Sequence, residues 1–122
     1  MASPRIAPCP PTPNCVCSDA GGGLHGIAPL EVAAIAEDAS AAWAALVAHL
    51  EADPTFRIIE QGDDYLAAEA RTSIIRFVDD VTFELRPDEG VIAMRSASRV
   101  GLSDFGTNRR RLEKVRKALL AD

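Results

Sequence analysis

The stretch "FVDDVTFELRPDEGVIAMRSASR", residues 77–99, predicts the fold more strongly than any other part of the chain. Each of its two halves alternates between apolar and polar residues, which is the period of a strand with one buried face. The residues "RPDEG" between the halves are typical of a tight turn, so the halves should pair as antiparallel neighbours. We expect strands over about 76–86 and about 91–100.

The register of this hairpin follows if Arg86 lies opposite Val91 across the turn. The inner face of the sheet then has an apolar end and a polar end. The predicted inner pairs are Leu85 with Ile92, Phe83 with Met94, Val81 with Ser96 and Asp79 with Ser98, and Phe77 shares their face. Because an unpaired buried carboxylate is costly, Asp79 must lie near a sheet edge, be hydrogen-bonded or be protonated.

The remaining elements complete an α+β pattern. Strands are predicted over about 56–61 and about 64–71, and helices over about 39–52 and about 105–120. The order of helix, four strands and helix predicts a four-stranded antiparallel meander with both helices on one face. Residues 1–30 are rich in Pro and Gly and are predicted to form an arm of loop, without helix or strand, before a single domain over residues 31–122.

The bulk composition excludes several classes of protein. With 122 residues, a net charge of −5 and a pI near 5.0, the chain is predicted to be one acidic domain that does not bind nucleic acid. No apolar run has the length of a membrane span, and the first residues lack the hydrophobic core of a signal peptide. The chain as given is expected to be cytoplasmic, or periplasmic if an N-terminal segment has been removed.

The three cysteines, Cys9, Cys15 and Cys17, leave three alternatives open. They can be buried free thiols, or Cys9 and Cys15 can form a disulfide across the Pro-rich loop in an oxidising compartment. Their spacing matches no zinc module, and no metal or cofactor is expected. In the third alternative the protein is a Cys-dependent hydrolase or transferase. Its candidate catalytic residues are Cys15 as nucleophile, His25 as base and Asp79 or Asp80 as the orienting acid.

Polar residues concentrate where the last strand leads into the last helix. Asn108 lies in the apolar stripe of that helix, so it should point inward and form a structural polar clip with Asp79, Ser96 and Ser98. The start of the helix, with its arginines, can instead bind an anion. The candidate ligand-binding residues are Arg95 and Arg99 on the outer sheet face and Ser103, Asp104, Arg109 and Arg110 at the corner.

Several motifs resemble the family called domain of unknown function 1499. They are "CPPTPNCVC", "HGIAPL", "YLAAEART", "FVDDVTFEL" and "RSASRVGLSDFGTNRRRLE", and the resemblance extends from Cys9 to about Leu119. It implies a compact domain of bacterial or plastid type and transfers no activity. Cys17 stands where the family pattern has a serine. The resemblance marks these positions as family hallmarks: Cys9, Pro10, Asn14, Cys15, Asp79, Asp80, Arg95, Ser96, Ser98, Arg99, Gly101, Ser103, Asp104, Gly106, Asn108 and Arg109.

Three functions are therefore compared. The leading hypothesis is a non-catalytic domain that binds a small anionic ligand or a protein partner through the strand-to-helix corner. The alternatives are the Cys-dependent enzyme and a purely structural or assembly module.

Overall fold

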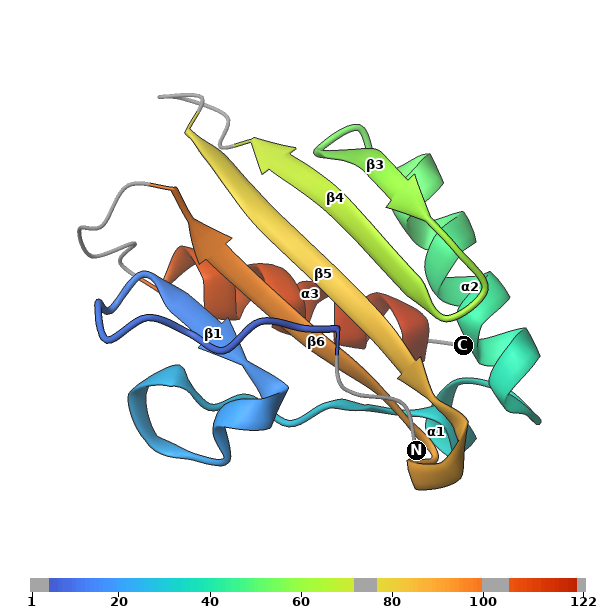
Figure 1. Ribbon diagram of the computed structural model, residues 1–122. Coiled ribbons are helices and arrows are strands. Elements are labelled where there is room, and N and C mark those ends of the chain that lie inside the picture. Colours follow the sequence, from blue (N-terminus) through green and yellow to red (C-terminus); the bar gives the residue numbers. More distant parts are fainter. Residues whose placement is uncertain (1–4, 72–76, 100–105, 121–122) are drawn as a thin grey trace.

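The computed structural model describes residues 5–71, 77–99 and 106–120 (Figure 1). Within these ranges the predicted α+β order is confirmed. The two predicted helices are α2 (Ala39–Ala52) and α3 (Thr107–Leu120), and the four predicted strands are β3 (Phe56–Gln61), β4 (Tyr65–Arg71), β5 (Val78–Arg86) and β6 (Val91–Ser98). The predicted element ends at residues 76, 100 and 105, and the candidate site residues Ser103 and Asp104, lie outside the described residues.

The predicted hairpin register is confirmed along its whole length. Arg86 lies opposite Val91 and Asp79 lies opposite Ser98, with the intermediate pairs as expected. The turn is a short 3-10 helix, η3 (Pro87–Glu89), followed by Gly90 in the left-handed region at φ 67°. A glycine has no Cβ to clash in that conformation, which is why the turn closes tightly here.

The sheet contains two short strands that the sequence did not predict. These strands, β1 (Cys15–Cys17) and β2 (Leu30–Glu31), both pair antiparallel with β6 and extend the meander to six strands in all. The expectation that residues 1–30 contain no helix or strand is therefore wrong. The edge of β6 presents backbone groups that need partners, and the segment supplies them. The same region also forms η1 (Ser18–Ala20) and η2 (Gly23–His25), and α1 (Val32–Ile35) follows β2.

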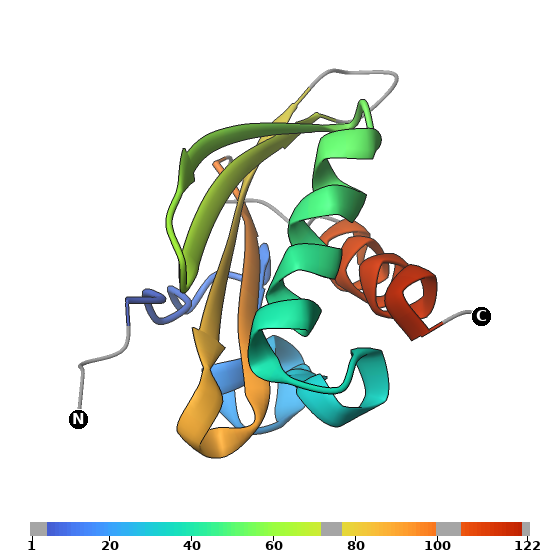
Figure 2. The same cartoon turned by 90° about the vertical axis from the view of Figure 1, so that its right-hand side faces the viewer.

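The helices cover one face of the sheet, and the N-terminal segment crosses the other (Figure 2). Between sheet and helices lies the main core, in which Leu46, Phe83 and Leu112 are fully buried. On the opposite face, Ile6 packs against Ala93 and Cys17 in a second, smaller cluster. The molecule therefore has an inner face towards α2 and α3 and an outer face towards residues 5–10.

The prediction that Phe77 lies in the core is wrong. Phe77 precedes β5 and is 47% exposed, so the buried face of the strand begins two residues later with Asp79.

No helix within the described ranges is both long enough and apolar enough to span a membrane.

Candidate functional site

A buried polar network joins β6 to the first turns of α3 on the inner face. Asn108 is fully buried, and its amide oxygen accepts a hydrogen bond from Ser96 Oγ at 2.6 Å. Its amide nitrogen donates to Ser98 Oγ at 3.0 Å. Because Asn108 is the second residue of α3, these hydrogen bonds fix the start of the helix against the sheet.

Arg111 provides the charge that compensates Asp79. Its Nη1 lies 2.7 Å from Asp79 Oδ2, and the two side chains are only 9% and 2% exposed. The same Nη1 also donates to Asn108 Oδ1 at 2.9 Å and to Ser96 Oγ at 3.1 Å. Neither carboxylate oxygen of Asp79 has a hydrogen bond of good geometry from any described residue, so the ion pair is the main compensation for its burial. Sequence reasoning missed Arg111, although its spacing of three from Asn108 places both on one side of a helix.

Asn14 directly precedes β1 and joins this network through its backbone oxygen and its side chain. Its backbone oxygen accepts from Asn108 Nδ2 at 3.1 Å and from the Ser98 amide at 2.9 Å. Its side chain donates to the Ser98 backbone oxygen at 2.8 Å. We call the whole set the inner network: Asn14, Asp79, Ser96, Ser98, Asn108 and Arg111.

A basic cavity of about 440 Å³ lies beside the inner network, between the end of α2, the start of β3 and the first turns of α3. Among its described lining residues three are cations and one is a carboxylate, Asp53, which already accepts a hydrogen bond from the Thr55 amide. The lining residues are His49, Asp53, Thr55, Phe56, Thr107, Arg110, Arg111, Lys114 and Val115. We call this the α2–α3 cavity.

Gly106 shapes the entrance to α3 next to this cavity. Its φ is 81°, and a Cβ at this position would lie 2.9 Å from Arg110 Nη1. The absence of a side chain therefore lets the Arg110 guanidinium lie close to the first turn, where its Nη2 is 3.4 Å from Thr107 Oγ1.

Arg109 points away from this cavity and binds the N-terminal segment. Its guanidinium donates to the backbone oxygens of Gly26 at 2.6 Å and Leu24 at 2.9 Å. Arg116, two turns later, donates in the same way to the backbone oxygens of Pro29 and Ala28. These arginines hold the segment that leads to β2 against α3.

The other two candidate arginines lie on the outer face of the sheet. Arg99 pairs with Asp80 at 2.9 Å and Glu69 at 2.8 Å, and these hydrogen bonds hold the pKa of its guanidinium above the usual range. Arg95 Nη2 lies 3.5 Å from the backbone oxygen of Pro8. The predicted ligand-binding arginines are therefore divided among three places, and of them Arg110 alone lines the α2–α3 cavity.

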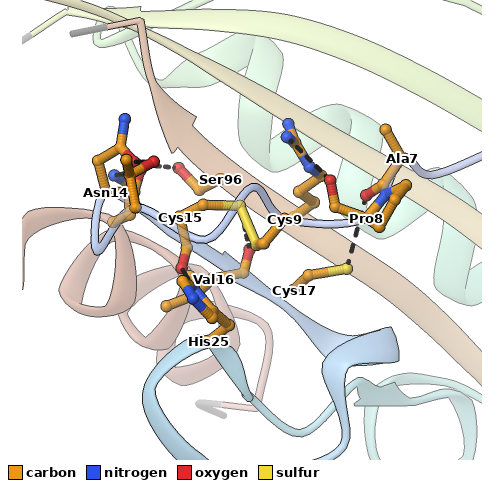
Figure 3. Close-up of a disulfide and its surroundings, with 12 residues drawn as sticks. Ala7, Pro8, Cys9, Asn14, Cys15, Val16, Cys17, His25 and Ser96 are labelled. Carbon is orange, nitrogen blue, oxygen red and sulfur yellow. Dashed lines mark hydrogen bonds between the residues drawn. A yellow bond between two sulfur atoms is a disulfide. The ribbon is translucent and has the colours of Figure 1, made fainter. Parts of the chain in front are cut away.

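The candidate catalytic residues do not form one constellation. Cys15 is bonded to Cys9 with an S–S distance of 2.02 Å (Figure 3), so it carries no thiol in this form. The ring of His25 contacts the backbone oxygen of Cys15 at 3.0 Å rather than its sulfur. Pairing with Ala97 places Cys15 on the outer face, whereas Asp79 faces inward. The other proposed acid, Asp80, is engaged by Arg99.

Cys17 is the free cysteine of the protein. It is 1% exposed, and its Sγ lies 3.9 Å from the backbone oxygen of Ala7 (Figure 3). Burial raises the pKa of this thiol above its usual value.

No group of three or more His, Cys, Asp or Glu side chains in the described part of the chain is arranged to hold a metal ion.

Together the sheet, its two covering helices and the disulfide-linked N-terminal segment define a small α+β domain with a buried polar network at one end. The family model described as protein of unknown function (DUF1499) matches residues 5–119, and the chain belongs to that family. No curated protein and no solved structure matches the sequence.

Proposed function

We propose that this protein is a non-catalytic domain that binds a small anionic ligand in the α2–α3 cavity. The observation that carries the proposal is the charge of this cavity. Arg110 and Lys114 line it together with Arg111, whose charge Asp79 largely offsets, and Asp53 is the one carboxylate among the described lining residues, in a chain whose net charge is −5. A local group of cations on a protein of net negative charge raises the concentration of anions near that group.

The start of α3 strengthens the attraction for an anion. Thr107, the first residue of this 14-residue helix, lines the cavity, so the positive end of the helix macrodipole lies at its wall. A hydroxyl and a guanidinium in the same turn offer hydrogen-bond donors of the kind that phosphate and carboxylate groups accept.

Arg111 gives the cavity a wall of fixed geometry. Each of its hydrogen bonds within the described residues uses Nη1, and these bonds hold the side chain in place. A side chain held in advance loses little conformational entropy when a ligand binds. Phe56 and Val115 add an apolar surface to the same cavity, so the site suits an anion with a small apolar part.

Titration with inorganic phosphate tests the proposal, followed by amide NMR at constant ionic strength in chloride. Saturable shifts are expected at Thr107, Lys114 and Phe56. Lys114→Ala and Arg110→Ala should each weaken binding about tenfold, because each removes a charge-assisted contact of about 1.5 kcal/mol.

Lys117→Ala is the matched control. Lys117 is an exposed cation of the same helix and does not line the cavity. Its loss changes the net charge of the protein as Lys114→Ala does, so phosphate affinity should stay within twofold of wild type. Equal weakening in Lys114→Ala and Lys117→Ala would show non-specific attraction, and absence of saturable shifts at tens of millimolar phosphate would reject the site.

A further inference from the structure

We infer that the Cys9–Cys15 disulfide is a site of thiol exchange, which a small thiol opens at the Cys9 sulfur, and that opening it releases Asn14 from the inner network. The inference does not depend on anion binding, since it concerns the outer face of the sheet and the contacts of Asn14.

The two cysteines of the disulfide differ in their exposure to solvent. Cys9 is only partly buried and lines a cavity of about 210 Å³. Cys15 is 1% exposed and is not among the lining residues. The cavity is formed by Pro8, Cys9, Cys17, Asp19, Ala20 and His25. A thiolate that enters this cavity therefore meets Cys9 first.

The exchange needs no oxidant and no metal. The sulfur of the incoming thiolate bonds to Cys9 Sγ, the bond between Cys9 and Cys15 breaks, and Cys15 leaves as a thiolate that takes a proton from water. A second thiolate then attacks the sulfur of the adduct, the bond to Cys9 Sγ breaks, Cys9 leaves as a thiolate that takes a proton from water, and the small molecules depart as their disulfide. Two thiols thus supply the two electrons that reduce the bond.

Cys17 is not the attacking group, although it lies in the same cluster as Cys9. Its Sγ is directed at the backbone oxygen of Ala7 (Figure 3), and burial keeps it in the unreactive thiol form at neutral pH. The nucleophile must therefore come from solution.

The consequence for the inner face follows from the position of Asn14. Asn14 directly precedes Cys15, and its backbone oxygen accepts a hydrogen bond from Asn108 Nδ2 on the inner face. The disulfide therefore holds the chain from the outer face at the point where Asn14 reaches into the inner network. Asn14 binds Ser98 through two hydrogen bonds and Asn108 through one. Once the disulfide opens, the loop between Cys9 and Cys15 loses its covalent closure, and these hydrogen bonds of Asn14 become easier to break.

Native-state treatment with 2-mercaptoethanol, followed by alkylation and peptide mass spectrometry, tests where exchange occurs. The first adduct should be on Cys9, with the alkyl label on Cys15 and none on Cys17. An adduct on Cys15, or reduction no faster than global unfolding, would overturn the inference. Cys17→Ser should give the same pattern as wild type because it keeps the disulfide.

Hydrogen exchange tests the release of Asn14. The Ser98 amide donates to the Asn14 backbone oxygen, so its exchange should accelerate at least tenfold in the reduced protein. The Phe83 amide, in the centre of the sheet, is the internal control and reports global unfolding. Cys9→Ser should reproduce the fast exchange without reductant; if that variant does not fold, the comparison of oxidised and reduced wild type decides alone. Unchanged Ser98 exchange would refute the coupling, whatever the phosphate titration shows.

Discussion

Replacing Asn108 with Ala tests whether the inner network holds α3 against the sheet. The side chain is fully buried, and its hydrogen bonds to other described residues include two through Oδ1 and two through Nδ2. Arg111 keeps its ion pair with Asp79, and the Asn14 oxygen keeps the Ser98 amide as a donor. The hydroxyls of Ser96 and Ser98 lose their amide partner, so they determine most of the cost.

The expected loss follows from the cost of leaving buried polar groups without partners. Each such group costs about 1 to 3 kcal/mol, and the partial exposure of Ser98 lets water replace one lost bond, so we expect a total of about 2 to 3 kcal/mol. An unfolding entropy of about 2.1 cal/mol/K per residue over 122 residues converts each kcal/mol into about 4 °C of Tm. The Tm should therefore fall by about 8 to 12 °C.

Urea denaturation and thermal melts, both followed by circular dichroism, measure this loss. The control is Lys117→Ala in the same helix, which should change the free energy of unfolding by less than about 0.5 kcal/mol. A double-mutant cycle with Ser96→Ala should give a coupling energy of at least about 0.5 kcal/mol, because the two side chains are hydrogen-bonded. A loss below about 1 kcal/mol in Asn108→Ala would refute a stabilising role for the network.

Three further variants test other contacts by urea denaturation. Asp79→Asn should destabilise by about 3 kcal/mol, because it leaves the buried Arg111 without its counter-ion, and a wild-type midpoint would contradict the ion pair. Cys9→Ser should cost about 2 kcal/mol, since it opens a loop closed over a sequence separation of 6, and adding reductant should not destabilise it further. Hydrogen bonds from Arg86 lower the pKa of Asp19 in the folded protein. This pair therefore stabilises the fold fully above pH 3.8, the usual pKa of Asp, and the stabilisation is lost as the pH falls through the lowered pKa of the folded state. Asp19→Asn should thus be less stable than wild type by under about 1 kcal/mol at pH 7, and the difference should shrink as the pH falls below 3.8.

The central hairpin could be predicted from sequence because two independent signals agree there. The period of two fixes which residues face inward, and the turn at Gly90 fixes the register, so a single assumed pair determined the others. Asn108 could be placed inward for a similar reason, since a polar residue in an apolar helical stripe must share its direction.

The N-terminal strand could not be predicted, because its three residues carry no period of their own. "CVC" lies between prolines and a run of glycines, and it pairs only because the edge of β6 is available to it. That pairing depends on contacts about 80 residues apart, which no local pattern records. The α2–α3 cavity is hidden for the same reason, as His49 and Arg110 come from separate helices.

Arg111 connects the inner network to the cavity, and its ion pair with Asp79 decides how much charge it contributes there. Because Asp79 lies 2.7 Å from its Nη1, the positive charge of Arg111 is largely offset inside the protein. Arg111 therefore contributes position more than charge to the attraction of the cavity for an anion. Asn108 accepts a hydrogen bond from Arg111 and donates one to the backbone oxygen of Asn14, which directly precedes Cys15. These hydrogen bonds therefore connect the cavity to the residue beside the disulfide. For this reason a phosphate titration of the reduced protein, compared with the oxidised form, would report whether opening the disulfide changes the cavity as well as the loop.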